Sequence, residues 1–171
     1  MLTSTLSLYL GTFIVWGFLM SFFLNLFFRC ISVKKDNLLV LCSFVIFLSY
    51  FISDHFYELF DKTEVYKTWF LYDIVTLVLI AFFHFLLRTK ASPGVFYVYL
   101  GLSINTILFG LMHLDIVIFE NKEQWILWDI YTAGVNIADF TMIVALITDR
   151  EILGLIKLKN QLQINTKKAL N

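Results

Sequence analysis

The sequence predicts an all-α, polytopic integral membrane protein, a helical bundle of five transmembrane helices followed by a short basic tail. Three observations lead to this fold class. Of the 171 residues, 60% are hydrophobic, which exceeds the roughly one half that is usual in soluble domains. The apolar residues fall into five runs of about 20 residues, the length that a helix needs to cross the hydrocarbon core of a bilayer. One proline and nineteen phenylalanines argue against a loop-rich or disordered chain.

The positions of the charged residues separate the five helices. Residues 1–28 carry no charge, and we expect the first span to be retained because it lacks the basic n-region and small-residue cleavage site of a signal peptide. The basic segment 29–36 separates the first two spans, and the polar segment 61–68 separates the next two. Pro93 suits the first turn of the fourth helix. The five expected spans cover residues 6–28, 37–60, 69–87, 93–119 and 125–147.

The distribution of Lys and Arg predicts the orientation in the membrane. With five spans and an outer N-terminus, ten basic residues lie on the cytoplasmic side and three outside. The ten are Arg29, Lys34, Lys35, Arg88, Lys90, Arg150, Lys157, Lys159, Lys167 and Lys168, and the three are Lys62, Lys67 and Lys122. Four crossings would give at best eight against five. We therefore expect an N-out, C-in bundle over 1–148 and a cytoplasmic, amphipathic basic tail over 149–171, in the plasma (bacterial inner) membrane.

Charge and cysteine usage narrow the possible partners. Thirteen basic and thirteen acidic residues cancel, so we expect no nucleic acid binding. Cys30 and Cys42 have no metal-site spacing, and we expect reduced thiols, no metal and no cofactor. Membrane lipids surround the spans. Four tail lysines are expected to contact lipid headgroups or a cytoplasmic protein partner: Lys157, Lys159, Lys167 and Lys168.

The run 125–147 combines a polar face with a face of small residues. At about 100° per residue, four polar side chains fall within an arc of about 80°: Asp129, Thr132, Asn136 and Asp139. Four small side chains occupy the opposite face and are expected to pack against other helices, with Gly134 and Ala138 used between copies of the chain: Gly134, Ala138, Thr141 and Ala145. Because neither face suits bare lipid, we expect this helix to be the most enclosed of the five and the chain to form homo-oligomers.

Other polar residues are predicted to converge at one depth. Measured from the middle of each span at 1.5 Å per residue, four lie roughly 8–10 Å outward of the midplane: Asp54, Asp73, His113 and Asp129. Asp73, Thr76 and His84 share one face of their helix. Together with the polar face of 125–147, these residues are expected to line an intramembrane path or pocket. Hydrogen bonds that merely hold the bundle together are the structural alternative.

The sequence favours a non-enzymatic membrane subunit that conducts or senses a proton, cation or small ligand and couples to a cytoplasmic partner through its tail. Two alternatives remain open. The abundance of Phe, Ile, Asn and Lys suits an accessory bacterial gene, such as a membrane anchor or signalling component of immunity or phage defence. His55, His113 and nearby carboxylates could instead form a metal-dependent enzyme acting on lipid or peptide near the outer leaflet, although no HExxH motif or nucleophile elbow occurs.

Overall fold

The computed structural model describes residues 2–55, 65–121, 123–150 and 154. In these ranges every regular element is a helix and no strand occurs. The helices are α1 (Leu2–Cys30), α2 (Asn37–His55), α3 (Val65–Leu87), α4 (Pro93–His113), the π-helical turn η3 (Leu114–Ile118) and α5 (Ile126–Thr148). Five helices are long and apolar enough to cross a membrane, with η3 continuing α4. The predicted helical fold class is therefore confirmed over the described residues, whereas the four tail lysines (Lys157, Lys159, Lys167, Lys168) lie outside them.

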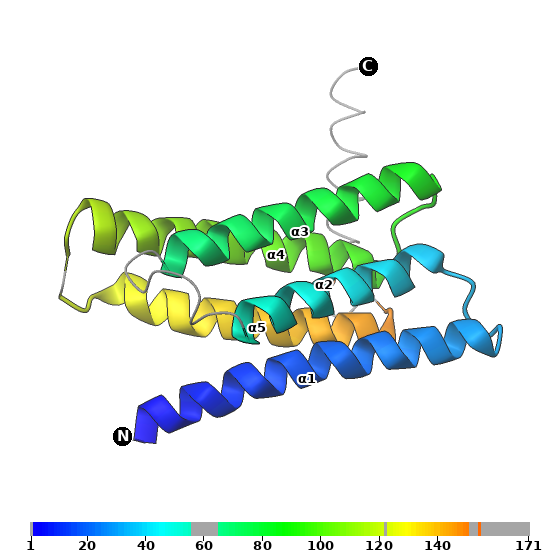
Figure 1. Ribbon diagram of the computed structural model, residues 1–171, viewed down its shortest axis with the longest axis horizontal. Helices are drawn as coiled ribbons and strands as arrows, with labels where there is room; N and C mark the ends of the chain where they lie inside the picture. The colour runs from blue at the N-terminus through cyan, green and yellow to red at the C-terminus, as the bar shows by residue number, and fades with distance from the viewer. Residues whose placement is uncertain (1, 56–64, 122, 151–153, 155–171) are drawn as a thin grey trace, which may run out of the picture.

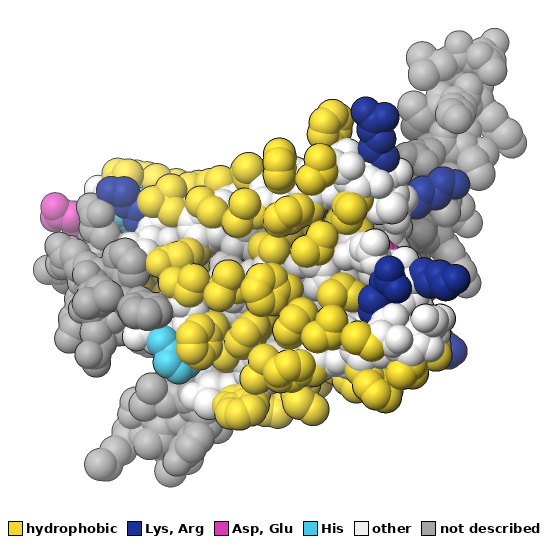
Figure 2. Space-filling model, turned by 45° about the vertical axis from the view of Figure 1, so that its right-hand side comes forward, with side chains coloured by type: hydrophobic (Ala, Val, Ile, Leu, Met, Phe, Trp, Pro, Cys, Tyr) yellow, Lys and Arg dark blue, Asp and Glu magenta, His cyan; other side chains and the backbone are white. Residues whose placement is uncertain are grey.

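Successive helices run antiparallel and form one bundle (Figure 1). α1 packs on α2 and α5, and α4 packs on α2, α3 and α5. The connections 31–36 and 88–92 lie at the same end of the bundle as the end of α5, and we call this the inner end after the predicted orientation. Figure 2 shows Lys and Arg side chains gathered at this end, beside a broad apolar surface. The orientation itself stays a prediction.

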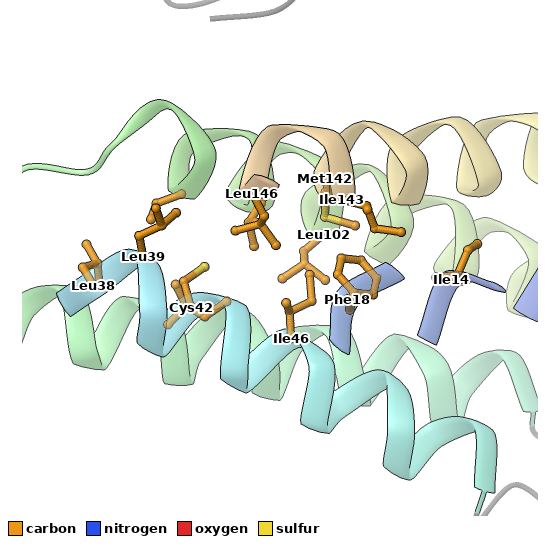
Figure 3. Close-up of a cluster of buried hydrophobic side chains, with 13 residues drawn as sticks. Ile14, Phe18, Leu38, Leu39, Cys42, Ile46, Leu102, Met142, Ile143 and Leu146 are labelled. Atoms are coloured by element: carbon orange, nitrogen blue, oxygen red, sulfur yellow. The ribbon is translucent and has the colours of Figure 1, made fainter. Parts of the chain in front are cut away.

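An apolar core fills the half of the bundle nearer the inner end (Figure 3). All five long helices contribute to it, and each of its side chains is less than a tenth exposed. Its members are Ile14, Phe18, Leu38, Leu39, Cys42, Ile46, Ile80, Val95, Val98, Leu102, Met142, Ile143 and Leu146. Because lipid tails are as apolar as these side chains, close van der Waals contact rather than the hydrophobic effect holds such helices together in a bilayer.

α4, and not α5, is the most enclosed helix. Of an 18-residue apolar stretch within Pro93–Ile118, half is buried, against a third of the corresponding stretch within α5. The expectation that α5 is the most enclosed helix was wrong. Its sequence periodicity shows that two of its faces are unsuited to lipid, but it does not show how many helices surround it. The number of neighbouring helices decides enclosure, and α4 has α2, α3 and α5 around it, whereas α5 packs mainly against α4 and α1.

Small residues permit the close packing of α5. A Cβ atom on Gly134 would lie 2.8 Å from the Leu108 side chain of α4, and one on Gly101 of α4 would lie 2.5 Å from the Met142 sulfur. Ala138 and Ala145 are buried, and Thr141 is half-buried. The structure thus places the small face of α5 largely against helices of the same chain, with α4 covering Gly134, and not at a surface left open to a second copy.

Gly101→Val is expected to lower the free energy of unfolding by about 1–3 kcal/mol, because the added side chain overlaps the Met142 side chain in a packed interface. Thermal unfolding in detergent, followed by circular dichroism, measures the effect. Gly110→Ala is the control, since a Cβ there meets the Phe70 ring at an ordinary 3.4 Å. Equal unfolding temperatures for both variants would contradict close packing at Gly101.

Candidate functional site

A hydrogen-bonded polar cluster interrupts the apolar interior near mid-depth. The Asp139 carboxyl of α5 accepts hydrogen bonds from the Tyr50 hydroxyl of α2 at 2.5 Å and from the Asn105 amide of α4 at 2.7 Å. The same amide donates to the Tyr50 oxygen at 3.0 Å. Asp139 is 3% exposed and Asn105 is fully buried. The three side chains thus join three helices through a closed triangle of hydrogen bonds.

A second carboxyl group, that of Asp73 on α3, lies beside this triangle. It is 5% exposed and is close enough to interact electrostatically with Asp139 and with Tyr50. One turn along α3, the hydroxyl of Thr76 lies 2.6 Å from that of Ser49 on α2. These six side chains come from α2, α3, α4 and α5, and we call them the polar cluster: Ser49, Tyr50, Asp73, Thr76, Asn105 and Asp139.

Two oxygen atoms in the polar cluster have no hydrogen-bond partner in the structure. They are Oδ2 of Asp73 and Oδ1 of Asn105, and both are buried. An unsatisfied buried acceptor is unfavourable by about 1–3 kcal/mol. Native interiors keep few such groups, and those that persist call for an explanation. An ordered water, a proton on the carboxyl group or a bound species would satisfy such acceptors.

Within the described residues, no basic side chain balances the charge of the two carboxyl groups. No Lys, Arg or His forms an ion pair with Asp73 or Asp139. The other titratable groups facing the pair are hydroxyls, Tyr50 of α2 and Tyr131 of α5. α4 contributes the neutral Asn105, and from α1 the Phe18 ring packs against the Tyr50 ring. Two neighbouring carboxylates in a low-dielectric interior disfavour double ionisation, so a shared proton or a bound cation would stabilise the pair.

Aromatic side chains close the polar cluster towards the outer end. Tyr66 and Trp69 of α3, Phe109 of α4 and Tyr131 of α5 contact one another in a closed ring, with centroid separations of 5.4 to 5.9 Å. Trp69 and Phe109 each lie one helical turn outward of a cluster residue. The apolar core begins one turn inward, at Ile46, Leu102 and Met142. The cluster is therefore enclosed between this aromatic ring and the apolar core.

The predicted polar face of α5 divides into a buried and an exposed part. Only Asp139 enters the interior, whereas Asp129 and Thr132 are exposed and Asn136 is half-buried. The Thr132 hydroxyl donates to the Trp128 carbonyl at 2.9 Å, and the Asn136 amide donates to the Thr132 carbonyl at 2.6 Å. The predicted path or pocket therefore has one buried member on α5, and the other three lie at or near the surface because α1 and α4 cover α5 on either side of them.

The structure does not gather the four outer residues into one constellation. Asp54 is nearly half exposed, lies 3.7 Å from His55 and faces Gly11 of α1. Asp129 is exposed, so only Asp73 and the half-buried His113 lie inside the bundle at this level, and His113 has a buried Nδ1 without a partner in the described residues. Equal depth was a poor guide because it leaves the rotation of each helix about its axis undetermined.

His84 lies apart from the polar cluster as well. Its Nε2 is 3.0 Å from the Thr89 carbonyl, and its Nδ1 is 3.5 Å from the Tyr99 hydroxyl. These contacts place the imidazole at the connection between α3 and α4, near the inner end. Of the residues predicted on one face of α3, Asp73 and Thr76 therefore belong to the cluster and His84 does not.

The sequence did not predict a hydrogen-bonded group around Asp115 at the outer end, which we call the carboxylate bracket. Buried Asp115 accepts hydrogen bonds from the Trp125 indole at 3.0 Å, the Trp128 indole at 3.1 Å and the Asn121 amide at 3.1 Å. The bracket fixes the connection between η3 and α5. An acidic residue at a span end followed within 13 residues by two tryptophans was the available signal, but both tryptophans read equally well as members of an interfacial aromatic belt.

Neither a search for metal-ligand groups nor a comparison with known proteins identifies a chemistry for this chain. Among the described residues, no group of three or more His, Cys, Asp or Glu side chains is placed to hold a metal ion. The described residues therefore offer no set of metal ligands to support the hypothesis of a metal-dependent enzyme. The chain matches no family model, no curated protein sequence and no solved structure. We therefore infer function from the polar cluster itself.

Proposed function

We propose that the chain is a multi-pass membrane subunit that senses protons through Asp73 and Asp139. The observation that carries this proposal is the pair of buried carboxyl groups from different helices, without a basic partner in the described residues. Their environments differ. Two donors hold Asp139 and favour its carboxylate form, whereas Asp73 keeps a buried oxygen without a donor and is the better place for a proton.

The surroundings of the polar cluster favour sensing over conduction. A conducting path requires polar groups or water through the full depth of the membrane. Inward of Asp139, however, α5 presents Met142, Ile143 and Leu146 to the apolar core. In the described part of the chain, the buried polar side chains further inward, Ser21, Asn25 and Ser43, donate to main-chain carbonyls and not to one another, so they form no hydrogen-bonded chain. A proton bound at Asp73 therefore changes the forces between helices rather than passing through them.

The helix contacts provide a way to transmit proton binding. Loss of the proton from Asp73 would increase repulsion between α3 and α5, the kind of local electrostatic change that biases a conformational equilibrium. At the inner end, the Asp149 carboxyl lies 3.6 Å from the Lys34 ammonium and accepts a hydrogen bond from the Gly94 amide at 3.1 Å. A shift of α5 would thus alter its contacts with the start of α4 and with the 31–36 connection.

Infrared difference spectroscopy of the protein in lipid nanodiscs tests the proposal. We expect a carbonyl band of a protonated carboxyl group that persists at pH values where ordinary Asp side chains are ionised and that disappears as the pH rises further. Asp73→Asn should remove the band, because an amide cannot take up this proton. Asp54→Asn, which changes an exposed acid, should retain it.

Two results would contradict proton sensing. The first is a band that survives in both Asp73→Asn and Asp139→Asn, since it would then come from another group. The second is a band that vanishes on addition of sodium at constant pH but is insensitive to pH in its absence, which would assign the carboxyl pair to a metal cation instead.

A further inference from the structure

We infer that protons reach Asp139 from the outer end along a hydrated polar stripe on α5. The stripe consists of Asp129, Thr132 and Asn136, and it ends at Asp139 in the polar cluster. The inference rests on the proposed function in one respect, because the carboxyl pair is the destination of the proton. The route is a separate property of the fold, and it can be tested without measuring protonation.

Exposure decreases steadily along the stripe. Asp129 and Thr132 are exposed, Asn136 is half-buried and Asp139 is 3% exposed. At 1.5 Å per residue, the ten steps from Asp129 to Asp139 cover about 15 Å of α5, from its first turn to mid-depth. The stripe therefore connects the outer surface to the polar cluster without a gap longer than about one helical turn.

The hydrogen bonds of the stripe leave its oxygen atoms free for water. Thr132 and Asn136 donate to main-chain carbonyls of α5 itself. The carboxylate of Asp129 makes no ion pair or hydrogen bond within the described residues, and the side-chain oxygen of Asn136 accepts none there. Acyl chains offer no donors, so a carboxylate and an amide facing them would be strongly unfavourable. Water entering from the outer end satisfies these groups.

The packing of α1 explains why this edge of α5 is open. Near the inner end α1 covers α5, because Gly17 lies against the Ile143 side chain and the Asn25 amide donates to the Leu146 carbonyl at 3.1 Å. Towards the outer end α1 stays with α2, where Gly11 lies near the Asp54 carboxyl. In Figure 1 the blue N-terminal half of α1 accordingly diverges from α5.

Two other approaches to the carboxyl pair are closed in the described part of the chain. The aromatic ring of Tyr66, Trp69, Phe109 and Tyr131 covers the polar cluster towards the outer end between α3, α4 and α5. The apolar core closes it towards the inner end. The stripe lies on the opposite edge of α5 from Gly134, which packs on α4, and so it bypasses the aromatic ring.

Cysteine labelling on intact cells tests the route. In a chain carrying Cys30→Ser and Cys42→Ala, single cysteines replace Thr132, Asn136 or Ile137, and a charged, membrane-impermeant maleimide is added outside. Ile137 is the matched control, because it lies at the depth of Asn136 but is 66% exposed on the apolar surface. We expect labelling at 132 and 136 to be at least tenfold faster than at 137, since only a hydrated thiol ionises to the reactive thiolate.

Two labelling results would overturn the inference. Equal, slow labelling at 136 and 137 would show that the stripe is dry. Protection of Asn136→Cys together with its disulfide cross-linking to a second copy would show that the stripe is an interface between copies. Either result leaves the infrared test of the carboxyl pair intact, so failure of the route and failure of proton sensing are distinguishable.

A kinetic measurement adds an independent readout. After an external pH jump, Asn136→Leu should slow the infrared response of the carboxyl pair at least tenfold and leave the final spectrum unchanged, because the stripe affects the route and not the destination. Ile137→Leu should respond at the wild-type rate. An unchanged rate in Asn136→Leu would contradict the route.

Discussion

Asp139→Leu is expected to lower the free energy of unfolding by about 2–4 kcal/mol, because it removes the shared acceptor of two buried donors. The Tyr50 hydroxyl and the Asn105 amide both donate to Asp139. Leucine has the same number and branching of side-chain heavy atoms but accepts no hydrogen bond, so the loss reflects unsatisfied donors rather than a cavity. Chemical unfolding in detergent measures this effect.

Two further variants show whether the hydrogen-bond triangle is responsible. Asp139→Asn retains an acceptor oxygen and should remain within about 1 kcal/mol of the wild type. The double variant Asp139→Leu/Asn105→Leu should lose less free energy of unfolding than the sum of its single variants. Replacing Asp139 leaves the Asn105 amide without an acceptor, and replacing Asn105 as well removes that unsatisfied donor. Strict additivity, or a fully stable Asp139→Leu, would contradict a role for the triangle in stability.

Hydropathy predicted that the helices exist, whereas the accuracy of their predicted ends varies from helix to helix. The third span was expected from residue 69, but α3 begins at Val65, because no Pro or Gly separates the polar residues 65–68 from the apolar run and the helix simply continues through them. The end of the second expected span, at 60, falls outside the described residues. For α5 the expected 125–147 differs from Ile126–Thr148 by one residue at each end.

The site could be predicted as a set of residue types but not as an arrangement. Asp73, Thr76 and Asp139 were identified because polar groups in apolar spans are rare. Tyr50 and Asn105 were left out of the expected site. A tyrosine has an apolar ring that suits a lipid-facing surface equally well, and an isolated Asn gives no periodicity. Which side chains meet depends on helix rotation and neighbour order, and a single-helix pattern contains neither.

The expected oligomerisation and the coupling to a cytoplasmic partner stay predictions. The described residues show how movement of α5 could change the inner end, where a cytoplasmic partner would bind. Asp149 joins the end of α5 to the start of α4 and to Lys34. A Cβ on Gly94 would lie 3.0 Å from the Ala145 carbonyl oxygen, so the α4 and α5 backbones approach closely here. Motion of α5 at mid-depth therefore has a tightly packed contact through which to act at the inner end.

Asp73→Leu is expected to have the opposite effect on stability from Asp139→Leu. Above the pH at which the infrared band disappears, where both carboxyl groups are ionised, we expect the free energy of unfolding to rise by about 1–3 kcal/mol. The variant then removes a buried oxygen without a partner and the repulsion between two carboxylates. The proton-dependent infrared band should be lost at the same time. Chemical unfolding and infrared titration of the same preparation measure both effects.

The opposite stability changes expected for Asp139→Leu and Asp73→Leu distinguish a proton-binding group from one that holds the helices together. A polar group kept only to hold helices together stabilises the bundle, and its removal lowers stability. A group kept for proton binding lowers stability in the empty state, and its removal raises stability while abolishing the response. Asp54→Leu is the control, since this exposed acid should change neither quantity. Reduced stability of Asp73→Leu with an intact infrared response would show that Asp73 holds the bundle together and that the proton binds elsewhere.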